Sequence, residues 1–152
     1  MRNWERKRSL STHRRRTSWE PAAAALGPIN GIVNCAGSIL LKAAHLTTEA
    51  EWNQTIETNL TTAYATVRGG AKALWPAGGS IVLCATAAAR TGLANHEAIA
   101  AAKGGVIELT LSAASTYATH NIGVHCVAPA LVDTPLALVV SSSLKSITLP
   151  PV

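Results

Sequence analysis

Three short apolar segments divide this sequence, and two long helical patterns separate them. The apolar segments are residues 29–34 (INGIVN), 80–84 (SIVLC) and 122–127 (IGVHCV). Each crossover between them is long enough to return the chain in parallel, so the order predicts an α/β fold with a partial doubly wound parallel sheet of three strands. The first segment lacks the alternation of a half-exposed strand, and we therefore expect both of its faces to be covered.

The first helical pattern begins with a capping box, in which Thr48 is the N-cap and Glu51 follows three residues later. We expect this helix to continue to about Leu74, before Pro76. A loop of small residues, 85–93, leads to a second long helix from about His96 to Thr119. Its small residues between 100 and 105 (AAAKGG) would let another helix approach closely. Apolar residues follow the capping box at helical spacing: Trp52, Ile56, Leu60, Tyr64 and Val67.

The basic charge of the chain is confined to its start. The whole chain has a formal net charge of +5, and the Lys and Arg excess lies in residues 1–20, while the remainder is balanced. We expect residues 1–20 to be a disordered basic tail, residues 21–137 one folded domain and residues 138–152 an unstructured end. A mitochondrial presequence or a nuclear-import patch remains an alternative for the tail. A neutral body gives no support for nucleic-acid binding by the folded part.

The cysteines and the apolar runs argue against a disulfide-bonded, metal-binding or membrane protein. The chain has three cysteines, Cys35, Cys84 and Cys126, each in or directly after an apolar run, and we expect buried, reduced thiols. No cysteine or histidine pair has the spacing of metal ligands, and His125 would point to the face of its strand opposite Cys126. No apolar run approaches the about 20 residues needed to cross a bilayer. These features predict a soluble cytoplasmic protein without a metal or a membrane partner.

Four motifs stand out in the sequence: residues 34–37 (NCAG), Asn59, residues 79–86 and residues 129–134 (PALVDT). In order and spacing they resemble motifs of the short-chain dehydrogenase/reductase family. Residues 34–37 (NCAG) are similar to the family's Asn-Asn-Ala-Gly motif after the fourth strand, and Asn59 to its helix asparagine. Residues 79–86 resemble the fifth strand with the catalytic serine, and residues 129–134 (PALVDT) the turn that holds the nicotinamide. The resemblance covers the middle and late part of the family's domain, so the chain looks truncated at both ends. It implies a Rossmann-like fold, NAD or NADP as cofactor, and an alcohol or ketone substrate.

The resemblance also implies roles for individual residues. Thr86 stands at the serine position and would orient the substrate oxygen. Lys103 would hold the cofactor ribose and lower the pKa of the catalytic acid, and Asn59 would hold a water in the proton relay. The implied cofactor contacts are Asn34, Ala36, Gly37, Lys103, Pro129, Val132 and Thr134.

Two departures from the family pattern concern its chemistry. The catalytic tyrosine of the family lies four residues before the lysine, where this chain has Ile99, and a hydrocarbon cannot donate a proton. His96 lies near the same helical face and could act as an acid, although a histidine at a helix start is more often a surface or capping residue. The family's glycine-rich phosphate loop has no counterpart. The chain has glycine pairs at residues 69–70 and 104–105, but both lie inside expected helices, where their backbone amides are not free to bind a pyrophosphate.

These observations lead to two main hypotheses. The first is an NAD(P)-dependent oxidoreductase that acts on an unknown small-molecule alcohol or ketone. The second is an inactive fragment or pseudoenzyme that only associates with other chains through its two long helices. The resemblance implies a homo-oligomer formed by these helices, and an open edge at strand 29–34 would also favour association. A third hypothesis, a nucleic-acid or import module, depends on residues 1–20 alone.

Overall fold

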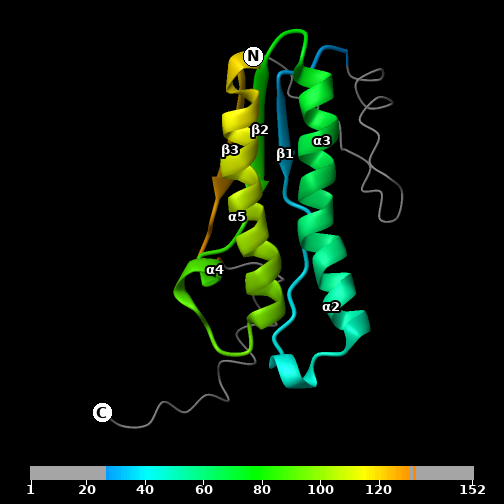
Figure 1. The fold of residues 1–152 in the computed structure, drawn as a ribbon, viewed down its shortest axis with the longest axis vertical. Coiled ribbons are helices and arrows are strands. Elements are labelled where there is room, and N and C mark those ends of the chain that lie inside the picture. Colours follow the sequence, from blue (N-terminus) through cyan, green and yellow to red (C-terminus); the bar gives the residue numbers. More distant parts are fainter. Residues whose placement is uncertain (1–26, 131, 133–152) are drawn as a thin grey trace, which may run out of the picture.

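The computed structural model describes residues 27–130 and residue 132. Its three strands form one parallel sheet in the order β1-β2-β3 (Figure 1). Gly31 of β1 pairs with Ser80 of β2, and Gly79 of β2 pairs with Ile122 of β3. The predicted α/β fold with a partial, Rossmann-like parallel sheet is thereby confirmed. The strands are β1 (Gly31–Asn34), β2 (Gly79–Cys84) and β3 (Ile122–Val127).

Two long helical stretches connect these strands, as predicted. The first is not a single α-helix, because a π-helical segment, η2, interrupts it between α2 and α3. The second is α5, whose N-cap is His96. The predicted loop at 85–93 contains one short helix, α4. The helical elements are η1 (Ala44–Leu46), α2 (Glu49–Ile56), η2 (Glu57–Thr61), α3 (Thr62–Leu74), α4 (Ala88–Thr91), α5 (Glu97–Tyr117) and η3 (Ala118–His120).

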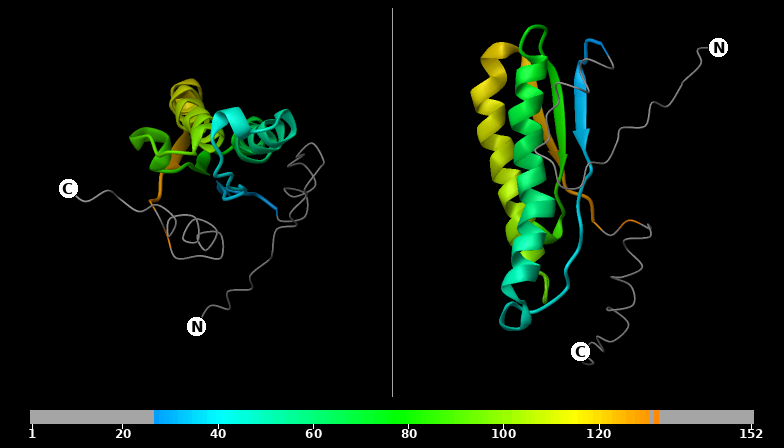
Figure 2. Two further views of the ribbon diagram at one scale, coloured as in Figure 1. Left: turned by 90° about the horizontal axis from the view of Figure 1, so that it is seen from below. Right: turned by 90° about the vertical axis from the view of Figure 1, so that its right-hand side faces the viewer.

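Helices α3 and α5 lie side by side on one face of the sheet (Figures 1 and 2). Both crossovers move along the sheet in the same direction, and right-handed crossovers of the same direction place their helices on the same face. In β1 the side chain of Ile32 is buried beneath these helices, whereas Val33 is 64% exposed. The expectation that both faces of this strand are covered is therefore wrong for the part of the chain described. Within the described part of the chain, β1 pairs only with β2, so none of these residues covers the outer edge of β1.

The core lies between this face and the two helices, and small residues on the helices allow close packing. A Cβ on Gly70 would lie 2.8 Å from Ile32 Cδ1, so α3 presses its backbone against the sheet. A Cβ on Gly105 would lie 3.0 Å from Leu60 Cδ2, which bears out the close approach expected at residues 100–105. The largest fully buried side chains are Leu74, Ile81, Leu83, Ile122, Val106 and Asn59.

The start of α2 has the predicted capping box. The hydroxyl of Thr48 accepts from the amide of Glu51, and the Glu51 carboxylate accepts from the amide of Thr48. The ammonium group of Lys42 also binds this carboxylate, at 2.8 Å. The hydrogen bond from Lys42, followed by those from Thr48, lowers the pKa of Glu51 to about 2. The carboxylate therefore stays ionised over nearly the whole acid range.

The cysteines differ from the expectation of buried thiols. Cys35 is exposed, and Cys84 and Cys126 are half-buried; all three are free. Cys35 directly follows the end of β1 at Asn34, and no helix of residues 27–130 covers the other face of the sheet there. Within the described residues no three metal-binding side chains are grouped, and no helix is long and apolar enough to cross a membrane. The expected tail (1–20) and end (138–152) lie outside the described residues.

Candidate functional site

The predicted site residues gather at the carboxyl edge of the sheet. Because the strands are parallel, β1, β2 and β3 all end at this edge, where open α/β sheets bind their ligands. The segments after the strands begin at Cys35, Ala85 and Ala128. Helix α5 then brings Lys103 to the same edge from the helical layer.

Lys103 is the central cation of this edge. It lies in α5 with 8% of its surface exposed, and its ammonium group donates a hydrogen bond to the carbonyl of Cys84 at 2.7 Å. Burial lowers its pKa, because removal from water penalises the charged form. An ammonium group carries three donors, and this is its single hydrogen bond to the described residues. The described residues therefore engage one of its three donors.

Asn59 lies inside the π-helical segment η2 and is fully buried. In an α-helix the carbonyl of Thr55 would accept from the backbone amide of residue 59. Here the side-chain amide of Asn59 donates to that carbonyl at 2.9 Å, so the wider turn leaves no unsatisfied acceptor. The same side chain donates to Ser38 Oγ and accepts from the Ser38 amide, each at 3.1 Å. Asn59 thus fixes the segment that follows β1.

Gly37 lies between these two side chains. A Cβ at this position would be 3.0 Å from Asn59 Oδ1 and 3.3 Å from Lys103 Nζ. A larger residue would therefore have to displace one of the two polar groups. Gly37, Asn59 and Lys103, which the sequence assigns to one site, are brought together by the fold. Ser38 joins them, and sequence reasoning missed it although it directly follows the NCAG motif.

Asn34 and Ala36 have mainly structural contacts. The side-chain amide of Asn34 donates to Thr66 Oγ1 of α3 at 3.0 Å, and its carbonyl oxygen accepts from the amide of Ala36 at 2.8 Å. The first bond attaches β1 to the helical layer, and the second turns the chain toward Gly37. The Asn34 side chain thus faces the protein, while Ala36 is exposed at the edge.

Thr86 forms a second group with Pro129. Its hydroxyl donates to the carbonyl of Pro129 at 3.5 Å, a long contact, and accepts from the amide of Ala88 at 3.3 Å. The amide of Ala87 donates to the same carbonyl at 2.9 Å. These bonds hold the segment after β3 against the segment after β2. Val132 is exposed, and Thr134 lies outside the described residues.

The position of the family's tyrosine is filled by hydrocarbon. Ile99 is 4% exposed and lies one turn before Lys103 on α5. His96 occupies the N-cap position without a side-chain cap bond, and its Nδ1 contacts the carbonyl of Ala94 at 2.7 Å. The glycine pairs at 69–70 and 104–105 lie inside α3 and α5, as expected. Neither offers free amides to a phosphate.

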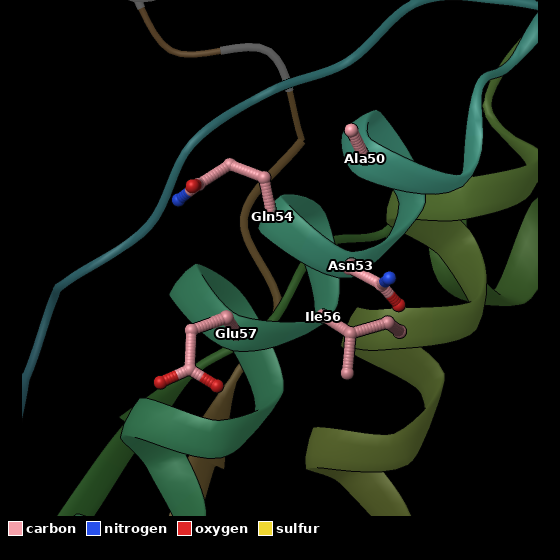
Figure 3. A pocket seen from close by; sticks show the side chains of 5 residues that line it. All are labelled: Ala50, Asn53, Gln54, Ile56 and Glu57. Carbon is pink, nitrogen blue, oxygen red and sulfur yellow. The ribbon is translucent and has the colours of Figure 1, made fainter.

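Two surface hollows lie away from this edge. One, of about 500 Å³, is lined by residues of α2 and the start of η2, and Figure 3 shows their side chains projecting from one continuous helical stretch. The other, of about 200 Å³, lies between α3 and α5. None of the predicted site residues lines either hollow. The lining residues of the first are Ala50, Asn53, Gln54, Ile56 and Glu57.

Comparisons with known proteins identify the family of the chain. Residues 11–144 match the family model for short chain dehydrogenases. The chain is 35% identical over 119 residues to the 3-oxoacyl-[acyl-carrier-protein] reductase FabG of Chlamydia pneumoniae, covering 78% of this chain and 48% of that protein. It is 39% identical over 117 residues to the cis-4-hydroxycyclohexanecarboxylate dehydrogenase of Sinomonas cyclohexanicum, covering 76% and 47%.

A solved structure shows the same fold. A protein from Sinorhizobium meliloti 1021 described as a short-chain alcohol dehydrogenase superimposes with a TM-score of 0.76 at 27% identity, covering 84% of this chain and 52% of that one. The chain spans about half the length of the relatives it matches. Since the family model covers most of the sequence and the fold agrees, this chain belongs to the short-chain dehydrogenase family of oxidoreductases.

Proposed function

We propose that the carboxyl edge of the sheet binds the ribose of a nicotinamide dinucleotide, NAD or NADP, through Lys103. The observation that carries this proposal is the buried ammonium group, which keeps two donors beyond its bond to Cys84. A buried charge with unused donors is costly unless a partner binds it. Two vicinal ribose hydroxyls offer oxygen acceptors of the required kind.

The remaining residues of the edge support this role. Gly37 lets the segment after β1 approach Lys103, and Asn59 holds that segment through Ser38. In the proposal the adenosine side of the dinucleotide contacts Ala36 and Gly37. The nicotinamide end contacts Pro129, Val132 and Thr134. Asn34 contributes by shaping the turn. Thr86 orients a substrate oxygen, and Asn59 supports the proton relay.

The proposed reaction is oxidation of an alcohol or reduction of a ketone, which the family's name describes. Hydride transfer needs a proton donor or acceptor at the substrate oxygen. The buried hydrocarbon of Ile99 stands where the resemblance places that group. We therefore expect this chain to bind the cofactor and to catalyse turnover only weakly by itself.

Calorimetric titration with NADH and NADPH tests the binding. Lys103→Met removes the ammonium group, and Lys72→Met removes an exposed lysine of α3 as a matched control. We expect saturable binding by the wild type and by the Lys72 variant, and at least about tenfold weaker binding by the Lys103 variant, which is about 1.4 kcal/mol. Circular dichroism establishes that each variant is folded. Folded wild-type protein that binds neither dinucleotide would refute the proposal.

A second function, association through the helices, is favoured by a different observation. Large apolar side chains lie exposed on α3 and α5, with Tyr64 54% and Leu111 58% exposed, and Trp52 of α2 is also exposed. The hollow between α3 and α5 includes Tyr64 and Tyr117 in its lining. These surfaces support a homo-oligomer formed by the two helical stretches. This second function requires no catalytic activity of the chain.

Sedimentation velocity separates this second function from the first. The double variant Tyr64→Glu and Leu111→Glu should be monomeric at concentrations where the wild type is not. Leu93→Glu, a substitution at an exposed leucine between α4 and α5, is the control and should leave the assembly unchanged. A monomeric wild type would refute association.

We also propose a cytoplasmic location, because all three cysteines are free.

A further inference from the structure

Two cysteines follow the last paired residues of neighbouring strands. Asn34 of β1 lies opposite Leu83 of β2 in the last pair of this register. The residue that follows each of them in the sequence is a cysteine: Cys35, directly after β1 ends, and Cys84, the last residue of β2. Adjacent strands lie about 4.8 Å apart. This spacing lies within the roughly 4.4–6.8 Å that separates the Cα atoms of a disulfide. The register therefore brings the two cysteines into bonding range.

Both thiols belong to the face of the sheet opposite helices α3 and α5. Side chains alternate along a strand, and Ile32 and Leu83 point into the core. The side chain of Asn34 also points toward the helices, since it donates to Thr66 of α3. The next positions, Cys35 and Cys84, therefore face the opposite side. No described helix covers them there (Figure 2).

Cys126 does not belong to this pair. It lies opposite Leu83 in the register of β2 and β3, and it packs against the hydrophobic core on the helical face. The third cysteine is thus an internal comparison for the other two. Any modification that merely follows from a free thiol would also affect Cys126.

We propose that Cys35 and Cys84 form a reversible dithiol–disulfide pair, a redox modification site at the carboxyl ends of β1 and β2. Its oxidant is a small disulfide of the glutathione type. Exposed Cys35 is the accessible thiol. Burial, above all, raises the pKa of Cys84. Lys103 lowers this pKa, and negative charges on Cys35 and Cys126 raise it. Cys35 is therefore the first nucleophile and Cys84 the resolving thiol.

The reaction balances in two exchanges. The thiolate of Cys35 attacks one sulfur of oxidised glutathione, forms a mixed disulfide and releases one glutathione thiolate. The thiolate of Cys84 then attacks the sulfur of Cys35 and releases the second glutathione. The two protein thiols lose two protons and two electrons, and one glutathione disulfide is reduced to two thiols.

The geometry makes this bond easily reversed and couples it to the carboxyl edge. Parallel neighbours hold their Cβ atoms at about the strand spacing of 4.8 Å, whereas a relaxed disulfide needs roughly 3.5–4.5 Å. The strain favours reduction, as in labile regulatory disulfides. The carbonyl of Cys84 accepts the hydrogen bond of Lys103, so a shift of Cys84 also moves the acceptor of that ammonium group.

Mass spectrometry of the full chain tests the pair without any dinucleotide, so failure of cofactor binding would not affect the result. The protein is equilibrated in a glutathione redox buffer, alkylated and digested with trypsin. The three cysteines then fall on different peptides, residues 17–42, 73–90 and 104–145. We expect peptide 17–42 linked to peptide 73–90 in the wild type and in Cys126→Ser, and loss of the link after reduction by dithiothreitol.

The single variants complete the test. Cys84→Ser should lose the linked peptide and keep glutathione on Cys35, because the resolving thiol is absent. Three outcomes would overturn the proposal: no oxidation of either cysteine, a stable glutathione adduct on Cys35 of the wild type with Cys84 alkylated, or a link that involves peptide 104–145. Circular dichroism of each variant shows that the chain remains folded.

Discussion

At the scale of single residues, the site depends on buried polar groups that hydrogen-bond to other protein atoms. Lys103 and Asn59 are buried polar side chains, and their hydrogen bonds go to Cys84, Thr55 and Ser38. Asn59 is neutral and has both amide donors engaged, so its burial costs little. Lys103 is charged and has donors to spare. The two residues therefore differ in what their removal should do.

The lowered pKa of Lys103 predicts how stability depends on pH. The folded state disfavours the charged form, so the unfolded chain binds more protons between the pKa of the folded state and the usual lysine pKa of 10.5. The free energy of unfolding of the wild type should therefore rise with pH in this window. The free energy of unfolding of Lys103→Met minus that of the wild type should therefore be largest near neutral pH. This difference should fall as the pH rises. Urea unfolding from pH 7 to 10.5 measures the difference. A difference that stays constant with pH would contradict it.

Ile99 gives a prediction about chemistry. Ile99→Tyr places a phenol one turn before Lys103, whose positive charge favours the ionised phenol. We expect this variant to gain dinucleotide-dependent oxidation of a small secondary alcohol over the wild type, followed by absorbance at 340 nm. The double variant with Lys103→Met should lose the gain. If the phenol is equally inactive with Lys103 present, the catalytic part of the proposed function fails.

At the scale of elements, the helices owe their placement to small residues and to one capping box. Gly104 and Gly105 are neighbours in α5, but only Gly105 faces Leu60. Gly104→Ala should stabilise the chain by roughly 0.5–1 kcal/mol, because alanine costs less conformational entropy in a helix and meets no atom within 4 Å. Gly105→Ala should gain less or lose stability, since its Cβ would lie 3.0 Å from Leu60 Cδ2. Urea unfolding compares the two, and equal gains would contradict this packing.

The start of α2 has its own dependence on pH. The pKa of Glu51 in the folded state lies at about 2, below the usual glutamate pKa of 4.5. Its contribution to stability is thus complete above pH 4.5 and is lost as pH falls toward 2. The wild type should exceed Glu51→Gln in stability at pH 7, and this margin should shrink between pH 4.5 and 2. Lys42→Met should show the same change, because it removes the main partner. A margin unaffected by acid would contradict the ion pair's role.

Local signals in the sequence predicted the elements well. The capping box fixed the start of α2, and Pro76 followed the end of α3 closely. Strand β3 has the predicted limits, because the left-handed residue Asn121 precedes it and Pro129 follows. These features act over a few residues, so the sequence carries them directly.

Long-range contacts set the features that the sequence did not predict. The π-helical turn contains Asn59, whose side chain donates to Ser38, 21 residues away in the sequence. The exposure of Cys35 depends on which face of the sheet the helices cover, and Asn34 fixes that face through Thr66. In the site, the motif spacing assigned Lys103, Gly37 and Asn59 to one place. The motif spacing could not show that the side chain of Asn34 faces helix α3.

At the scale of the whole molecule, one parallel sheet brings the predicted polar site residues that the structure describes to one edge. The carboxyl edge holds Gly37, Lys103 and Thr86, whereas the opposite edge holds Gly78 and Asn121. Both hollows lie on the helical stretches and not at this edge. Binding and association should therefore use different surfaces, and variants of one should leave the other unchanged.

The most direct test of this account is to locate the dinucleotide by nuclear magnetic resonance. Titration of the isotopically labelled full chain with NADPH, and separately with NADH, reports on every assigned backbone amide. The account predicts the largest shifts at residues 35–38, 84–87 and 103, with Gly78 and Asn121 unaffected. Absence of shifts with both dinucleotides, or shifts centred on the opposite edge, would contradict it.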